Sequence, residues 1–288
     1  MNIRKTRFSR ATVALLASLS LAVAACTSKE DGQAAQGHQA ETTLAHIKQN
    51  KAMTVGVKAD TPPYGFLPQG STEPEGFDID IVHELARRMD VKLNMVEVTS
   101  ANRIANLTTG KVDFLVSSLV HTRKRDEVID YSITYFADSQ KILVPEGSAI
   151  REIEDLAGKR VAVGQGSIQE QIIKAVQPQA KVLSMAKWSD TLQSIQANQV
   201  DAIFSAAGVL DGLRKSATSA GMKVAMVGRD GLAPIPYAIG VRQGDADLRD
   251  ALNRLLMDMV DDGTYEKIFK KWWGEVYDQP YQVEVWPE

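Results

Sequence analysis

The chain has 288 residues, of which 44% are hydrophobic, 24% charged and 6% aromatic, and these values are typical of a globular protein. They exclude an intrinsically disordered chain, a collagen, a coiled coil and a multispan membrane protein. The length exceeds the roughly 100–200 residues of one typical domain, so one large domain or two smaller ones are both open.

The first 25 residues have the features of a secretory signal peptide. A basic stretch, residues 4–10, precedes an apolar run, residues 11–25, that is rich in Leu and Ala and ends in small residues. This run is too short to span a membrane comfortably. We therefore expect export, with removal of residues 1–25.

Cys26, the only cysteine of the chain, directly follows this segment. The sequence Val23-Ala24-Ala25-Cys26 resembles the lipobox of bacterial lipoproteins, in which the peptide is cut before a cysteine that carries acyl chains. A lone exposed thiol would be reactive outside the cell, which favours lipid attachment over a chance cysteine. The sequence therefore predicts a lipoprotein held in a bilayer through acylated Cys26.

Removal of the signal peptide changes the charge of the protein. It takes away four of the 33 Lys and Arg residues and none of the 36 Asp and Glu residues, which leaves a net charge of about −7. No general basic surface for nucleic acid is expected from this balance. An anionic ligand would have to be bound by a few local cations.

The next segments predict a tether and then an α/β lobe. Residues 26–43 have almost no apolar content and are typical of a flexible tether. The folded part is expected to begin near Leu44. Alternating strands and helices follow, which indicates a parallel sheet. The predicted strands are residues 53–57, 91–98 and 112–116; the predicted helices contain Val82, Leu85, Ala86 and Met89, and then residues 102–109.

The same alternation recurs in the second half of the chain. Residues 110–114 and 198–202 occupy equivalent points, a weak internal repeat that favours two similar lobes with a cleft between them. Trp272 and Trp273 are expected to serve packing. The predicted elements are strands 160–163, 181–183, 200–204 and 237–241, and helices 168–176, 191–197 and 248–260.

No pattern of catalytic or cofactor-binding residues is found. The four histidines have no metal-ligand spacing, and the chain lacks a nucleophile elbow and a phosphate-loop lysine motif. Gly166 and Ser167, directly before a helix, offer backbone N–H groups to an anion. Their alternative interpretation is a plain helix cap by Ser167. We expect no cofactor, no metal and no catalytic residue.

One segment of the sequence resembles the signature of a known protein family. The sequence Gly76-Phe77-Asp78-Ile79-Asp80-Ile81, followed by Leu85-Ala86 and Met89, resembles the signature of the bacterial extracellular solute-binding proteins of family 3, the amino-acid-binding components of ABC importers. The likeness runs from about residue 44 to 274. It implies an α/β fold of type II periplasmic binding proteins, with two lobes, each a small, mostly parallel sheet flanked by helices.

The resemblance also implies domain limits and a ligand site. Lobe 1 would comprise residues 44–142 and 235–274 and lobe 2 residues 143–234, with 275–288 as a C-terminal tail. Arg125 falls where the family's arginine binds the ligand α-carboxylate through a bidentate fork. Ser167 and Ile168 would bind the same carboxylate through N–H groups. The full set of expected ligand-binding residues is Lys58, Tyr64, Arg103, Ser117, Ser118, Arg125, Gly166, Ser167, Ile168 and Ser205.

Two of these residues indicate the kind of ligand. Lys58 and Arg103 lie in segments that resemble the branch of the family that binds aspartate and glutamate. Ala206 and Val120 depart from the family, which usually has an Asp for the ligand ammonium at the first position and a hydroxyl at the second. Either a neighbour such as Asp60 or Ser205 replaces that Asp, or the ligand is a dicarboxylate without an ammonium group.

The sequence thus predicts a monomeric solute-binding lipoprotein that binds a small acidic amino acid and delivers it to ABC permease subunits in the membrane. Closure of two lobes on one ligand would be its mechanism. The alternatives are a sensor that presents its ligand to a receptor and a dehydratase on the same fold, although no acid–base catalyst is evident.

Overall fold

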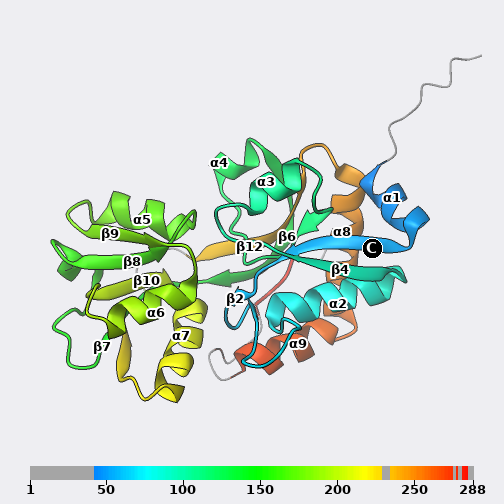
Figure 1. Cartoon of the computed structure of the whole chain (residues 1–288). Coiled ribbons are helices and arrows are strands. Elements are labelled where there is room, and N and C mark those ends of the chain that lie inside the picture. Colours follow the sequence, from blue (N-terminus) through cyan, green and yellow to red (C-terminus); the bar gives the residue numbers. More distant parts are fainter. Residues whose placement is uncertain (1–41, 229–233, 275–276, 278–280, 285–288) are drawn as a thin grey trace, which may run out of the picture. The chain divides into compact units, whose positions relative to one another are not determined.

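The computed structural model describes residues 42–228, 234–274, 277 and 281–284 (Figure 1). The described residues form one compact unit. The predicted signal peptide, Cys26 and nearly all of the predicted tether lie outside the described residues. The first element is helix α1 (Thr43–Asn50), whose N-terminus is capped by the Thr42 side chain. The described fold thus begins beside Leu44, the residue where apolar content returns.

The first sheet has five strands in the order β4-β1-β5-β12-β6. Strand β1 runs parallel to β4 and β5, whereas β12 runs antiparallel to β5 and β6. The bounds are β1 (Ala52–Val57), β4 (Lys92–Glu97), β5 (Phe114–Leu115), β6 (Ile129–Asp138) and β12 (Ile235–Arg242). A separate two-stranded ladder, β2 (Asp60–Thr61) and β3 (Gly65–Phe66), forms in the proline-containing loop after β1.

Helix α2 (Phe77–Met89) shows how the sequence pattern produces the helical layer of this lobe. Its apolar residues recur with helical spacing and are buried against β1, α8 and α9, while Asp80 and the buried Asp78 lie in its first turn. Asp90 ends the helix in the left-handed conformation. The other helices of this lobe are α3 (Arg103–Thr108), α4 (Arg123–Asp126), α8 (Ala246–Asp261) and α9 (Thr264–Trp273).

The second sheet also has five strands, in the order β11-β7-β10-β8-β9. Strand β8 runs parallel to β9 and β10, and β7 runs antiparallel to β10 and β11. The strands are β7 (Gln140–Pro145), β8 (Arg160–Gly164), β9 (Lys181–Met185), β10 (Ala202–Ala206) and β11 (Val224–Val227). The helices beside them are the 3₁₀ turn Ile153–Leu156, α5 (Ile168–Val176), α6 (Trp188–Gln196) and α7 (Ala207–Ser219).

The two-lobed α/β fold is confirmed, but each sheet is mixed rather than mostly parallel. The difference arises because one strand of each sheet, β12 in the first and β7 in the second, runs antiparallel to both of its neighbours. Strand β12 was predicted from the sequence, whereas β6 and β7 were not. The chain leaves the first sheet after Asp138, enters the second at Gln140, and returns with β12. The finer domain limits at residues 142 and 234 stay predictions.

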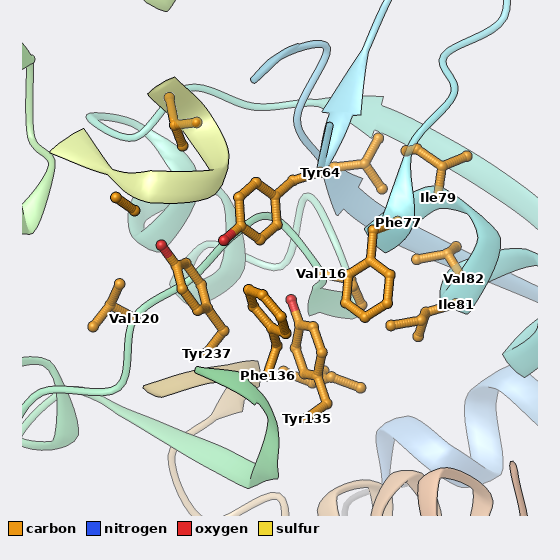
Figure 2. Packing of buried hydrophobic residues seen from close by; sticks show 14 of the residues in the cluster. Tyr64, Phe77, Ile79, Ile81, Val82, Val116, Val120, Tyr135, Phe136 and Tyr237 are labelled. Atoms are coloured by element: carbon orange, nitrogen blue, oxygen red, sulfur yellow. The ribbon is translucent and has the colours of Figure 1, made fainter. Parts of the chain in front are cut away.

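An aromatic cluster fills the core beside these crossings. Figure 2 shows Tyr64, Phe77, Tyr135, Phe136 and Tyr237 with their rings gathered together. The ring of Trp273 stacks on that of Phe136 at 4.7 Å between centroids and is fully buried. The predicted packing role of Trp273 is therefore confirmed. In the part of the chain that the structure describes, no helix combines the length and the apolar character needed to cross a membrane.

Candidate functional site

A small cavity is bordered by residues of both lobes. Its wall is built from the segments that follow β1, β4, β5, β8 and β9 and from the end of β10. This location agrees with the rule that ligands of open α/β sheets bind outside the carboxyl ends of the strands. The residues that line it are Thr61, Ser100, Arg103, Ser118, Val120, Ser167, Ile168, Gln169, Trp188, Ser205, Val209 and Tyr237.

Arg103 is the charged side chain among these twelve residues. Its Nη1 donates to the carbonyl oxygens of Ser117 (2.6 Å) and Ser118 (3.2 Å), while its Nε has no described partner. Burial, reinforced by the charge of Arg125, lowers the pKa of Arg103. Arg103 is only 2% exposed, and no described carboxylate forms an ion pair with it. Its charge is therefore available to an anion in the cavity.

Ser118 is held on the wall in a strained conformation. Its φ of 46° lies in the left-handed region, which is unfavourable for a residue with a side chain. The conformation is fixed because its N–H donates to Asp78 Oδ2 (2.6 Å) and its hydroxyl donates to the Ser117 carbonyl (2.8 Å). Asp78 Oδ1 accepts from the Tyr135 hydroxyl, and burial raises the pKa of this carboxyl to about 7.

Arg125 connects the two lobes behind the wall. Its Nη1 donates to the carbonyl of Val120 (2.9 Å) and its Nη2 to the carbonyl of Gly166 (3.2 Å) in the second lobe. Burial lowers the pKa of this arginine, and no described carboxylate lies within ion-pair distance of it. Its guanidinium thus lies directly beside two segments that border the cavity, although it is not itself a lining residue.

The second-lobe wall presents hydroxyl groups that have no described hydrogen-bond partner. Ser167 Oγ and Ser205 Oγ are both buried and unpartnered. Ser167 precedes helix α5 but its hydroxyl makes no capping bond, so the expectation of a plain side-chain cap is not met. Ile168 begins the same helix. This wall therefore offers polar groups that no other part of the described chain uses.

Gly166 permits the close approach of the two lobes. Its φ of 71° is one that other residues adopt rarely, and a Cβ atom at this position would lie 2.8 Å from the Cα of Ala101 in the first lobe. A side chain here would push the lobes apart.

Lys58 lies next to the cavity but does not line it. Its Nζ forms a 2.8 Å ion pair with Asp60 Oδ1, and both side chains are buried, at 1% and 10% exposed. Burial is the larger cause that lowers the pKa of Lys58, and the nearby Asp60 opposes that shift. The other oxygen of Asp60 accepts from the backbone N–H of Trp188 at the start of α6 (3.3 Å). In this structure the charge of Lys58 is balanced by Asp60.

Tyr64 and Ser117 also lie off the cavity wall. Tyr64 is fully buried, donates its hydroxyl to Asp138 Oδ2 (2.9 Å) and packs edge-on against Trp273 (Figure 2 shows Tyr64). Ser117 contributes its carbonyl oxygen to Arg103, and its own hydroxyl is buried without a described partner. Their roles in ligand binding stay predictions.

Several lining residues were not identified from the sequence. They are Thr61, Ser100, Gln169, Trp188, Val209 and Tyr237. The positions of Gln169 and Trp188 carry a usable signal, because each falls in the first turn of a helix that directly follows a strand of the second sheet. Tyr237 could not be found in this way, because it lies within β12 and not at the start of a helix. An isolated backbone bridge to Val120 places it beside the cavity.

Taken together, two α/β lobes that share a small polar cavity define a ligand-binding protein of the two-lobed type. Within the described ranges, no group of three or more His, Cys, Asp or Glu side chains could hold a metal ion. The chain belongs to the bacterial extracellular solute-binding proteins, family 3, whose sequence profile matches residues 53–275. The predicted family is therefore confirmed.

Known proteins similar to this chain support the same assignment. The ABC transporter glutamine-binding protein GlnH of Bacillus subtilis is 34% identical over 272 residues, which cover 93% of this chain and 97% of that protein. An ancestral arginine-binding protein bound to glutamine has a TM-score of 0.73 and 34% identity, over 78% of this chain and 98% of that one. The chain is thus an amino-acid-binding ABC solute-binding protein.

A third similar structure concerns the predicted alternative of an enzyme. The ancestral amino-acid-binding protein AncCDT-1, described as a precursor of cyclohexadienyl dehydratase, has a TM-score of 0.73 and 30% identity, over 80% of this chain and 99% of that chain. That protein is itself an amino-acid-binding protein, and the matched relatives are solute-binding transport proteins.

Proposed function

We propose that this protein is the lipid-anchored binding component of an ABC importer for a small acidic amino acid, aspartate or glutamate. One observation carries the proposal. Arg103 borders the cavity and Arg125 lies just behind it, yet neither arginine forms an ion pair with a described carboxylate, and no described lining residue is acidic. Because buried cations need a counterion, a ligand with two carboxylates fits this charge distribution.

Binding would proceed by closure of the lobes. The ligand contacts the first lobe through Arg103 and Ser118 and the second lobe through Ser167 and Ser205, so it binds the closed form more tightly than the open form. That difference in affinity shifts the equilibrium toward closure. The closed protein then delivers its ligand to the permease subunits.

A thermal-shift screen of residues 44–288 tests the proposed ligand. Aspartate and glutamate should raise the melting temperature more than glutamine, arginine or histidine do, because binding to the native state adds to stability. Stabilisation by a neutral or basic amino acid alone would refute the acidic assignment. Stabilisation only by dicarboxylates that lack an ammonium group would support the related ligand class in place of an amino acid.

Glutamine is the second candidate ligand, and two observations favour it. The Lys58 ammonium is balanced by Asp60, which leaves one cation fewer for an acidic side chain. Two relatives, from Bacillus subtilis and Geobacillus stearothermophilus, are named as glutamine-binding proteins. The same screen separates this candidate from the acidic amino acids.

The lipid anchor and the transport role have their own tests. A Cys26→Ser change should release the protein from the membrane fraction if Cys26 carries the acyl chains, and unchanged fractionation would refute the anchor. Deletion of the protein should abolish uptake of its ligand if it serves an importer. Retained uptake with loss of a ligand response would support the alternative of a sensor.

A further inference from the structure

The charge of the cavity is not balanced by the described residues around it. Arg103 and Arg125 bond to backbone carbonyls, and Asp78, the buried carboxylate close enough to interact with Arg103, is already bonded to the Ser118 N–H and the Tyr135 hydroxyl. One ligand carboxylate balances one arginine. The second arginine then needs a second negative charge. The ligand must supply this charge if the protein has no carboxylate of its own beside the ligand ammonium.

Gln169 occupies the position on the second-lobe wall where such a carboxylate could act. It lines the cavity, is 5% exposed, and lies in the first turn of α5. Its Nε2 donates to Oε1 of Gln140 (3.2 Å), so the amide oxygen of Gln169 is the end that is left for a ligand. Gln140 is itself 4% exposed, and its Nε2 has no described partner.

The surroundings of this amide pair are neutral. Gln140 is the register partner of Ala206 across the β7–β10 ladder, and Ser205 precedes Ala206 on the cavity wall. These side chains, a methyl group, a hydroxyl and two amides, carry no charge. An ammonium group has three donors and no acceptor, so an amide oxygen can bind it without adding a negative charge to the cavity.

Building on the proposed function, we propose that Gln169 determines the ligand specificity of this protein. Its amide oxygen, oriented by Gln140, receives the ammonium group of the ligand. Because this subsite is neutral, an amino acid with a second carboxylate offsets more of the positive charge of Arg103 and Arg125 than a neutral zwitterion does. A carboxylate at residue 169 would supply that negative charge from the protein and reduce the advantage of an acidic side chain on the ligand.

Two variants test this role, because Gln169→Glu adds one charge with almost no change in shape and Gln169→Met removes the amide without adding charge. Isothermal titration with glutamate, glutamine and glutarate, the last of which has no ammonium group, compares them with the wild type. The preference for glutamate over glutamine should fall at least about tenfold in Gln169→Glu. In Gln169→Met the affinity for glutamate should fall about tenfold, and that for glutarate should stay within about twofold.

The opposite results would overturn the inference. An unchanged ratio of glutamate to glutamine affinity in Gln169→Glu excludes a charge-selective role for this residue. Equal weakening of glutamate and glutarate in Gln169→Met excludes contact with the ammonium group and indicates a general packing role. Failure of the wild type to bind either aspartate or glutamate would refute the proposed function itself. This outcome is distinguishable from failure of the inference about Gln169, because it is seen in the wild type before any substitution is made.

Discussion

The two walls of the cavity differ in how their polar groups are held. On the first-lobe wall, Arg103 and Ser118 are fixed by buried hydrogen bonds to backbone carbonyls and to Asp78. On the second-lobe wall, the hydroxyls of Ser167 and Ser205 have no described partner. Unpartnered buried polar groups are costly, so a ligand that satisfies them recovers part of that cost.

This difference suggests a division of roles between the lobes. The first-lobe wall carries a preorganised positive charge, and we propose that this charge supplies most of the affinity for an anion. The second-lobe wall carries neutral groups, and we propose that the ligand completes their hydrogen bonds when it is enclosed. The first wall should therefore be sensitive to charge substitutions, and the second to the loss of single hydrogen bonds.

The largest expected effect concerns Asp60, which links the walls through Lys58 on one side and the Trp188 N–H on the other. Asp60→Asn would leave the buried Lys58 ammonium without its counterion and should lower the free energy of unfolding by about 3 kcal/mol. Chemical denaturation measures this loss. The double variant Lys58→Met/Asp60→Asn is the control and should regain most of it; an equally unstable double variant would contradict the pairing.

The next effect is a pH dependence of the free energy of unfolding. It arises from Asp78, the buried carboxyl group that holds Ser118 on the first-lobe wall. Burial raises the pKa of Asp78 from 3.8 to about 7 in the folded protein. Between these values the folded chain binds more protons than the unfolded chain, so stability should fall as pH rises through this window, by roughly 2–4 kcal/mol. Asp78→Asn should flatten the profile measured by denaturation at several pH values. Burial also raises the pKa of Asp138, which contributes with the same sign and is left unchanged in the variant.

The charge on the first-lobe wall is tested by Arg103→Ala. Loss of a charge-assisted hydrogen bond should weaken an acidic ligand roughly 10- to 150-fold and a neutral ligand far less. Titration calorimetry with both ligands measures the two losses. Equal losses would show that Arg103 supports the fold of the wall without selecting for charge. A parallel Lys58→Ala variant tests whether the paired lysine shares this selectivity.

The smallest expected effect lies on the second-lobe wall. Ser167→Ala removes one neutral hydroxyl that has no partner within the described protein. Affinity should fall about 2- to 12-fold, and the stability of the ligand-free protein should stay the same or rise slightly, because an unsatisfied buried group is removed. A clear loss of stability without ligand would mean that this hydroxyl is already bonded within the protein.

The elements of the fold that could be predicted from the sequence are those with a strong local hydrophobic pattern. Helix α2 and strands β1 and β8 were predicted because their apolar periodicity is strong. Helix α7 was missed because Gly208 and Gly212 weaken the helical pattern. The structure explains both glycines, since a Cβ at Gly208 would lie 2.5 Å from the Trp273 ring and one at Gly212 would lie 2.4 Å from the Pro62 carbonyl oxygen.

Site residues that directly follow the end of a strand could be predicted from the sequence. Contacts between two side chains within the fold could not. Arg103, Ser118 and Ser167 were named from the sequence, and all three line the cavity. The ion pair of Lys58 with Asp60 depends on the geometry of one loop, which no sequence pattern records. The contact between Gln169 and Gln140 joins residues that lie 29 positions apart, so only the folded chain brings it into view.

The most direct test of a cavity that selects its ligand by charge is the affinity of the wild-type protein for glutamate compared with glutamine, measured by titration calorimetry at neutral pH. The two ligands have nearly the same shape and differ by one charge, so the ratio reports the unbalanced arginines almost alone. We predict that glutamate binds at least about tenfold more tightly than glutamine. Equal affinities, or tighter binding of glutamine, would contradict a cavity that selects its ligand by a second carboxylate.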